Sequence, residues 1–200
     1  MRMQDKEAQL EQIAQELSTL ETSPLYQYRQ ENGYQFVFGE GDPDADIMFI
    51  GEAPGEQEAQ SGRPFVGRSG QVLNELLELI DLDRDDVYIT NVVKDRPPDN
   101  RDPRVEEIKL YTPFLLRQIE IIEPKMIATL GRFAMEFMLE QFDLPLQGEK
   151  ISDLHGRPIA MQIDERPITL VPLFHPAVAL YSRNRRRTLE DDFRVLRRYI

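Results

Sequence analysis

Three short segments of the chain carry residue types that could recognise a small polar molecule and act on it. The first is Gly51-Glu52-Ala53-Pro54-Gly55, a proline-stiffened turn that contains Glu52 and is followed closely by Glu58. The second segment ends in Asn91, and the third begins with His175. Glycines let backbone N–H groups approach a ligand, an amide both donates and accepts hydrogen bonds, and an imidazole can stabilise developing charge. Together these groups could read the polar edge of a ligand and assist its chemistry.

Each of these signals is weak when taken alone. The glycine-rich turn lacks the Lys-Ser or Lys-Thr pair that follows the glycines of a nucleotide-binding P-loop. A lone Asn at the end of a strand is often only a cap or turn residue, and a lone His before Pro often has a structural role. The functional interpretation therefore depends on whether the fold brings the three segments together.

Alternating strand-like and helix-like segments predict such a fold. The strand-like segments are short, continuous apolar runs at residues 46–51, 87–91, 125–130 and 168–174. Apolar residues recur at helical spacing in residues 6–20, 70–80, 105–122, 132–142 and 189–200. Strands that are apolar throughout are typical of parallel sheets covered on both faces. We therefore predict an α/β fold, a three-layer α/β/α sandwich around a central four-stranded parallel sheet, with residues 36–38 as an additional segment.

The predicted sheet gives the three segments a common location. In open parallel sheets, ligands bind beyond the carboxyl ends of the strands. Glu52, Asn91 and His175 each lie at or just after the end of a predicted strand. We therefore expect them to meet at one edge of the sheet.

Composition limits the remaining possibilities. The chain has 200 residues, of which 40% are hydrophobic, and no linker-like stretch divides it, so we expect a single domain over residues 1–200. No apolar run approaches the length of a bilayer, and residues 1–15 are charged, so we expect a cytoplasmic, soluble protein. The absence of cysteine excludes disulfides, thiolate zinc sites and cysteine-ligated iron–sulfur clusters.

The charge distribution is uneven. A net charge of −12 argues against a protein that coats nucleic acid without specificity, because such binding depends on lysine and arginine. Arginines nevertheless crowd the C-terminal segment, at Arg183, Arg185, Arg186, Arg187, Arg194, Arg197 and Arg198. This segment could present one basic edge to DNA, or it could be an ordinary solvated helix.

In its strand-end and loop motifs the chain resembles the family 4 uracil-DNA glycosylases, and the resemblance covers nearly the whole length of the chain. The matching motifs occur in family order, at residues 37–43, 51–55, 62–67, 88–94, 96–98, 100–103 and 175–177. A related group in the same superfamily forms a covalent link to DNA through a histidine in an arginine-rich insertion. Residues 94–103 contain no histidine, so that group is set aside.

The resemblance implies roles for individual residues. It makes Asn91 the reader of the uracil edge, Phe65 the ring that stacks on the flipped base, and Glu58 the group beside uracil C5 that excludes thymine's methyl. It makes His175 the donor to uracil O2 as negative charge develops on the departing base.

The group that holds the attacking water is left open by the resemblance. Glu52 is the natural carboxylate candidate, with Glu58 and backbone carbonyls of the 51–55 turn as alternatives. Ala53 stands where another family carries a water-activating Asp, and Ala53 and Gly55 are expected to bind substrate. We expect catalysis mainly through leaving-group stabilisation and positioning.

The resemblance also predicts the contacts with DNA. Leu180 is the expected wedge that fills the space left by the flipped base, and Tyr181 replaces an arginine usual in relatives. The other predicted DNA-binding residues are Arg183, Arg185, Arg186 and Arg187.

The chain departs from the family at an iron–sulfur cluster. The four positions that carry cysteine in relatives are Leu20, Ser23, Asp95 and Tyr111 here, so we expect no cluster and no other metal or cofactor. We expect Tyr111 to be buried near Leu20, with its hydroxyl bonded to Asp95 or Ser23.

The sequence thus predicts a monofunctional uracil-DNA glycosylase, an enzyme that hydrolyses the N-glycosidic bond of uracil in single- or double-stranded DNA and leaves an abasic site. We expect a monomer. The alternative is a catalytically degenerate relative that binds uracil or DNA without cleavage. An α/β hydrolase or nucleotide-binding enzyme unrelated to DNA would require all the motif matches to be coincidental.

Overall fold

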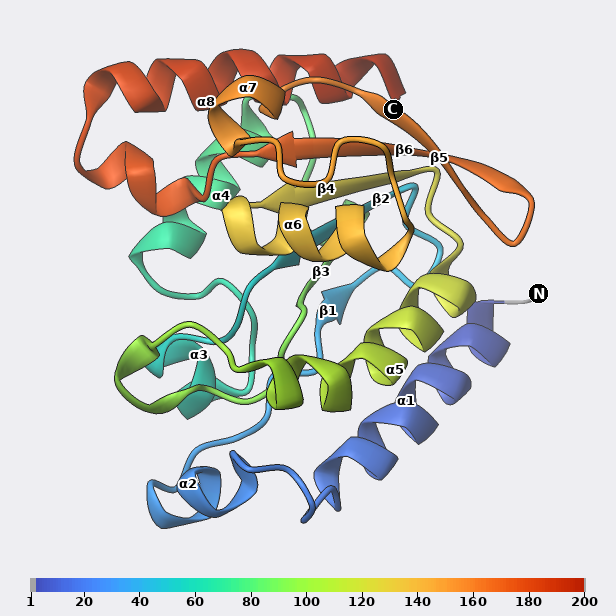
Figure 1. The fold of residues 1–200 in the computed structure, drawn as a ribbon, viewed down its shortest axis with the longest axis vertical. Helices are drawn as coiled ribbons and strands as arrows, with labels where there is room; N and C mark the ends of the chain where they lie inside the picture. Colours follow the sequence, from blue (N-terminus) through green and yellow to red (C-terminus); the bar gives the residue numbers. More distant parts are fainter. Residues whose placement is uncertain (1–2, 200) are drawn as a thin grey trace.

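A mixed β-sheet forms the centre of the molecule, in a computed structural model that describes residues 3–199 (Figure 1). Its strands are β1 (Glu40–Gly41), β2 (Ile47–Gly51), β3 (Tyr88–Asn91), β4 (Met126–Leu130), β5 (Ile159–Ile163) and β6 (Arg166–Leu173). The strand order is β1-β3-β2-β4-β6-β5. The four inner strands are parallel, as predicted, but the prediction of a four-stranded sheet was wrong because an antiparallel strand lies on each edge.

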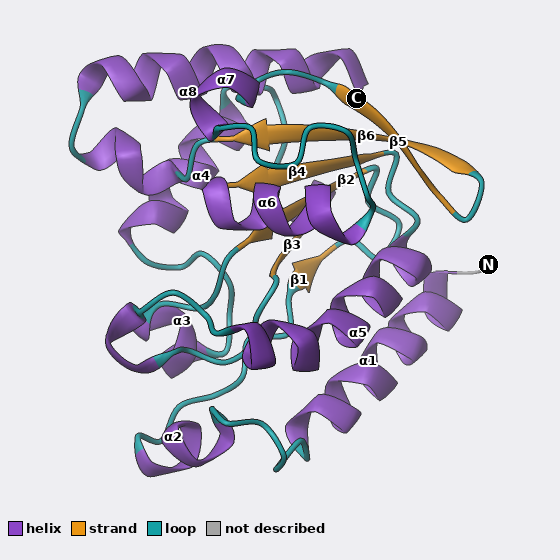
Figure 2. Cartoon of the chain, in the orientation of Figure 1, coloured by secondary structure: helices purple, strands orange, loops and turns teal. Residues whose placement is uncertain are grey.

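Helices cover both faces of this sheet (Figure 2). The α-helices are α1 (Met3–Ser18), α2 (Tyr26–Glu31), α3 (Glu56–Ser61), α4 (Arg68–Glu78), α5 (Val105–Ile122), α6 (Arg132–Gln141), α7 (Ile151–Leu154) and α8 (Arg183–Leu196). The short 3₁₀ helices are η1 (Arg84–Asp86), η2 (Pro98–Asn100), η3 (Pro176–Leu180) and η4 (Arg197–Tyr199).

The two cores confirm the three-layer arrangement. One hydrophobic core lies on each face of the sheet. Because successive residues of a strand point to opposite faces, β2 contributes side chains to both cores. Met48 and Ile50 pack with α1, α5 and α6, whereas Ile47 and Phe49 pack with α4 and α8. In Figure 1, α1 and α5 lie side by side, and the two helices are also in contact. Strands β2, β3 and β4 are buried at every residue, and β6 is buried over its last four residues, which explains why these runs are apolar without alternation.

The hairpin formed by β5 and β6 was missed in the sequence. Its turn is Asp164-Glu165, and both residues adopt positive φ angles of 49° and 65°. Such a turn suits a two-residue hairpin, but the usual signal is Asn-Gly or Asp-Gly rather than two acidic residues. The alternating burial of β5 identifies it as a strand with one open face.

The C-terminal helix begins six residues earlier than the predicted start at Leu189. Ser182 is its N-cap and accepts a hydrogen bond from Arg185 N at 3.3 Å. The first turns were hidden because they carry arginines and no apolar stripe. The other predicted end of this helix, Ile200, lies outside the described residues. The segment at 36–38 is not a strand, although Val37 N donates to Lys94 O at 2.7 Å.

Candidate active site

A pocket of about 400 Å³ opens beyond the carboxyl ends of β2, β3 and β6. The parallel strands end at one edge of the sheet, so residues distant in sequence converge there. The predicted residues that line the pocket are Ala53, Gly55, Glu58, Phe65, Asn91, His175, Leu180 and Tyr181. The three segments that stood out in the sequence therefore do form one site.

Asn91 is the last residue of β3 and is 2% exposed. Its Oδ1 is buried and has no hydrogen-bond donor among the described residues. Asn91 is paired in register with Gly51 of β2, and a Cβ on Gly51 would lie only 2.4 Å from Asn91 Oδ1. Glycine at position 51 therefore makes room for an amide oxygen that the protein leaves available to a ligand.

Phe65 forms a wall of the same pocket. Its ring atoms would lie 2.6 and 2.8 Å from a Cβ on Gly51, so the ring packs directly over the strand end. The ring centroid is 5.7 Å from that of His175, with the planes tilted by 33°. Phe65 thus presents an aromatic surface beside Asn91, as expected for a residue that stacks on a planar ligand.

His175 begins the segment after β6, and its hydrogen bonding defines its tautomer. Ala177 N donates to His175 Nδ1 at 3.2 Å, so Nδ1 is an acceptor and carries no proton. Burial lowers the pKa of His175 to about 4, against the opposing effect of the Glu58 charge. The neutral ring therefore carries its proton on Nε2, which remains a donor at neutral pH.

Glu58, on α3, braces the loop that carries Phe65. Its Oε1 accepts hydrogen bonds from Val66 N and Gly67 N, each at 2.9 Å. Its Oε2 lies toward Gly55, where a Cβ would approach it to 2.7 Å. Glu58 therefore has a structural role in addition to its place in the pocket wall.

Glu52 occupies a different position from the other predicted catalytic residues. It is half-buried at the end of β2 but does not belong to the pocket lining. Burial raises the pKa of its carboxyl, the charge of Asp102 raises it further, and Arg132 opposes both effects. The raised pKa is compatible with a role for the Glu52 carboxylate as a proton acceptor, although Glu52 is not part of the pocket lining.

The wedge residues lie at the rim. Leu180 ends η3 and is half-buried, while Tyr181 is 83% exposed. A large aromatic side chain with such exposure is available for contact with a partner.

The arginines of α8 differ in their surroundings. Arg183, Arg185 and Arg187 are exposed, and the guanidinium of Arg185 lies 4.6 Å from the centroid of the Phe174 ring. Arg186 instead donates to Glu75 at 2.5 Å and to Glu190 at 3.1 Å. The charge of Arg186 is paired with these two carboxylates, which distinguishes it from the other three predicted DNA-binding arginines.

Lys94 was not singled out in the sequence, yet it is fully buried below the site. Its Nζ donates to Thr90 Oγ1 at 2.6 Å, to Asn91 O at 2.8 Å and to Gln118 Oε1 at 2.5 Å. Burial lowers the pKa of Lys94 well below its usual range. The hydrogen bond from Lys94 Nζ to Asn91 O thus holds the backbone at the end of β3, where Asn91 is presented to the pocket.

Several further residues line the pocket without having been assigned roles from the sequence. They are Glu56, Gln57, Gly67, Arg68, Ser69 and Ala177. Gly67, Arg68 and Ser69 belong to the glycine-rich motif at residues 62–70, so a signal was present but gave no function for single side chains.

Of the four positions where the family resemblance places cluster cysteines, three carry hydrogen-bonded side chains in this protein: Ser23, Asp95 and Tyr111. Tyr111 is fully buried, donates to Asp95 Oδ2 at 2.6 Å and lies 2.6 Å from Ser23 Oγ. Leu20 is half-buried against the same hydrophobic core. Arg29 donates to both oxygens of Asp95, at 3.1 and 3.3 Å. The predicted burial and bonding of Tyr111 are confirmed, and a donor set without thiolates does not fit an iron–sulfur cluster.

Over residues 3–199, no group of three or more His, Asp or Glu side chains is arranged to hold a metal ion. None of the described helices is both long enough and apolar enough to cross a bilayer.

Sequence comparisons agree with this fold and site. The model of the uracil DNA glycosylase superfamily matches residues 38–197, so the chain belongs to that superfamily. A type-4 uracil-DNA glycosylase of Sulfurisphaera tokodaii is 44% identical over 94% of this chain and 83% of its own length. A type-4 uracil-DNA glycosylase of Thermotoga maritima is 41% identical over 94% of both chains, and that of Archaeoglobus fulgidus is 40% identical over 94% of this chain and 91% of its own. The resemblance to type-4 enzymes found in the motifs is thereby confirmed.

Proposed function

We propose that this protein is a monofunctional DNA-repair glycosylase that flips uracil out of DNA, hydrolyses its N-glycosidic bond and leaves an abasic site. The observation that carries the proposal is the buried Asn91 Oδ1, an acceptor in the pocket with no donor among the described residues. Uracil offers an N3–H donor beside its O4 acceptor. Asn91 Oδ1 would accept from N3–H while Nδ2 donates to O4. Cytosine presents the reverse pattern at both atoms, so the amide rejects it.

His175 would assist departure of the base. As the bond between N1 and C1′ breaks, the bonding electrons move onto uracil and charge develops at O2. The Nε2–H of a neutral His175 can donate to that oxygen, since Nδ1 is already occupied by Ala177 N. A preorganised donor of this kind stabilises the transition state more than the ground state.

The pocket walls would hold the base in place. Phe65 would supply the stacking face and Glu58 would exclude a methyl group on C5, and both residues line the pocket. Ala53 and Gly55 keep the adjoining wall small enough for a planar base to enter.

A water molecule must attack C1′ from the face opposite uracil and give up a proton. Glu58 Oε1 is engaged by Val66 N and Gly67 N, which makes it a poor base. Glu52 belongs to the turn at residues 51–55, although it is not part of the pocket lining. We assign the positioning of the water to this turn, with the Glu52 carboxylate as proton acceptor, and attribute most of the catalysis to leaving-group stabilisation.

DNA would approach the rim of the pocket. Leu180 fills the gap left by the flipped base and Tyr181 stacks beside it, as apolar and aromatic side chains do at disturbed base steps. Arg183, Arg185 and Arg187 supply phosphate contacts. We propose that a single domain acts as a monomer on single- or double-stranded DNA.

The protein would work without an iron–sulfur cluster. The proposal is supported by the absence of cysteine and by the hydrogen bonds that join Tyr111 to Asp95 and Ser23. Purified protein should be colourless and contain less than about 0.1 iron per chain by elemental analysis, in keeping with the need for thiolate ligands. A yellow-brown protein with stoichiometric iron would refute this part of the proposal.

Release of the base from matched oligonucleotides tests the activity. Strands that differ only in uracil, cytosine or thymine at one position are incubated with the protein and then cleaved with alkali. We expect cleavage of the uracil strand alone. Tight binding of the uracil strand without release would instead support the degenerate, binding-only alternative.

A further inference from the structure

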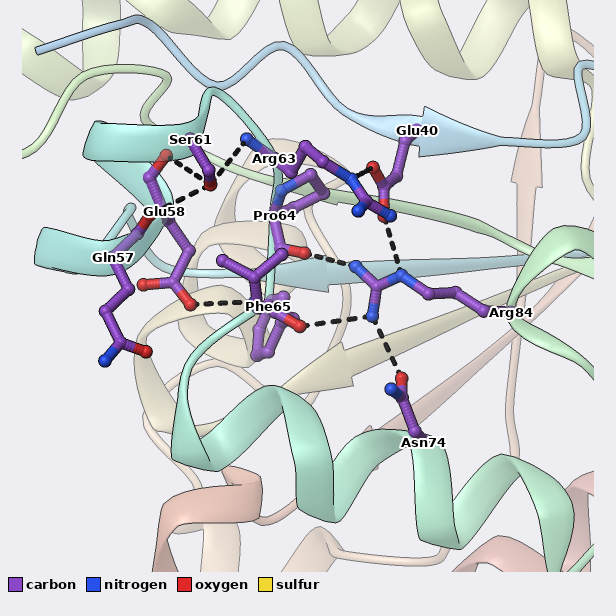
Figure 3. A network of polar contacts seen from close by, with 10 residues as sticks. Glu40, Gln57, Glu58, Ser61, Arg63, Pro64, Phe65, Asn74 and Arg84 are labelled. Carbon is purple, nitrogen blue, oxygen red and sulfur yellow. Dashed lines mark hydrogen bonds and ion pairs between the residues drawn. The ribbon is translucent and has the colours of Figure 1, made fainter.

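Arg84 lies in η1, just before β3, and its side chain is only 16% exposed. The guanidinium points into the molecule and meets acceptors from three other segments (Figure 3). It donates to Glu40 Oε1 at 2.6 Å, to Asn74 Oδ1 at 3.1 Å and to Phe65 O at 3.2 Å, and it also donates to Pro64 O. Two of its four acceptors are therefore successive carbonyls of the loop that carries the Phe65 ring.

Phe65 needs such support because its backbone is unusual. Its φ angle is +50°, in the left-handed region that residues with a side chain rarely adopt. A conformation of this kind persists only where the surrounding structure enforces it. The Arg84 contacts hold the carbonyls on both sides of the strained residue's N–Cα–C unit.

Other contacts restrain the same segment from different directions. A Cβ on Gly70 would lie 1.7 Å from Phe65 O, so the first turn of α4 approaches this carbonyl closely. On the far side of the loop, Glu58 accepts from Val66 N and Gly67 N. Arg84 is the cationic member of this set and, unlike Glu58, it lies outside the pocket lining.

The backbone conformation of Phe65 determines where its ring lies. The ring packs against Gly51 with so little space that a Cβ there would lie 2.6 Å from it. A rotation of the Phe65 backbone would carry the ring away from Asn91 and His175. Misplacement of a binding group by about 1 Å can lower a rate by about a hundredfold.

We propose that Arg84 is a positioning residue for the reaction, which holds the Phe65 ring in the orientation that stacks on the flipped uracil. This inference rests on the proposed function, in which Phe65 is the stacking residue. Glu40 and Asn74 orient the guanidinium, and the guanidinium fixes the carbonyls of Pro64 and Phe65. A planar fork with several donors suits this arrangement, whereas a lysine ammonium would not reproduce it.

A double-mutant cycle of Arg84→Gln and Phe65→Ala tests the inference. The readouts are the single-turnover rate of uracil release at saturating enzyme and the melting temperature of each variant. Arg63→Gln is the matched control, because Arg63 binds the same Glu40 at 2.7 Å but has a side chain that is 60% exposed. If Arg84→Gln melts below the assay temperature, Arg84→Lys takes its place in the same cycle.

We expect Arg84→Gln to lower the rate by about tenfold to a hundredfold in the parent and by less than about twofold in the Phe65→Ala background. Arg63→Gln should stay within about twofold of the parent. Equal losses from Arg84→Gln in both backgrounds would overturn the inference, since Arg84 would then act independently of the ring. An unchanged rate in Phe65→Ala alone would instead refute the stacking role in the proposed function, and the inference with it.

Discussion

Replacing Tyr111 by phenylalanine isolates the contribution of the hydroxyl to stability. The hydroxyl donates to Asp95 Oδ2, and because it has only one proton, Ser23 Oγ donates to it in turn. Ser23 Oγ also accepts from Leu25 N at 3.1 Å. A directed chain of hydrogen bonds therefore runs from Leu25 through Ser23 and Tyr111 to the carboxylate of Asp95.

The expected loss follows from what remains after substitution. Asp95 would keep its two contacts with Arg29, and Ser23 would keep its bond from Leu25 N. No carboxylate oxygen is left without a donor, so the cost is that of a hydrogen bond to a charged group, about 2 kcal/mol of the free energy of unfolding. Tyr111→Ala also empties a fully buried aromatic site and should cost about 3–5 kcal/mol.

Urea unfolding followed by circular dichroism measures both losses, provided that the slope of the free energy against urea concentration is unchanged. The melting temperature of Tyr111→Phe should fall by about 4–8 °C. Uracil release by the folded variant should stay within about twofold of the parent, because Tyr111 does not line the pocket.

Two results would refute this reasoning. Equal destabilisation by Tyr111→Phe and Tyr111→Ala would mean that the hydroxyl accounts for the whole loss of stability and that the packing of the aromatic ring contributes nothing. No destabilisation by either substitution would mean that this corner of the protein is loosely packed rather than a hydrogen-bonded core.

Three further predictions concern pH and salt. Because burial lowers the pKa of His175 from 6.5 to about 4, the unfolded chain alone binds a proton there between these pH values. The free energy of unfolding, measured with urea, should thus fall as pH drops through this window. It should fall less steeply in His175→Gln. Asp102→Asn removes a charge that raises the pKa of Glu52. The acid limb of the pH profile of uracil release should therefore move to lower pH. An unmoved acid limb would exclude Glu52 as the titrating base. Arg185→Ala should reduce the slope of log affinity for DNA against log salt by up to about one unit, whereas Arg186→Ala, whose arginine is paired with two carboxylates, should change it little. Equal effects of the two substitutions would contradict the assignment.

The parts of the fold that could be predicted from the sequence are those specified by a local pattern of apolar and polar residues. The inner strands could be predicted because continuous apolar runs are required wherever a strand is covered on both faces. The meeting of Asn91 and His175 in one pocket followed from the rule that ligands bind at the carboxyl ends of parallel strands, whereas Phe65, Leu180 and Tyr181 were assigned from the family resemblance. The hairpin at Asp164 and Glu165 could not be predicted, since its left-handed turn lacks glycine or asparagine.

The features that escaped prediction depend on packing between distant elements. Arg84 lies in the run Asp83-Arg84-Asp85-Asp86, which is typical of a solvated turn, and only the tertiary structure turns its side chain toward the Phe65 loop. Arg186 looked equivalent to its neighbours until α8 packed beside α4 and brought it to Glu75. Lys94 became a buried donor only because Gln118 of α5 faces the end of β3.

The central claim is that Asn91 reads uracil in a pocket that also breaks its glycosidic bond. Single-turnover uracil release by the parent and by Asn91→Asp, with binding of the same oligonucleotide measured alongside, tests this claim most directly. An aspartate carboxylate cannot donate to O4, so we predict that the parent releases uracil and that Asn91→Asp is slower by about a hundredfold or more. Release by Asn91→Asp at the rate of the parent, or binding by the parent without any release, would contradict the account.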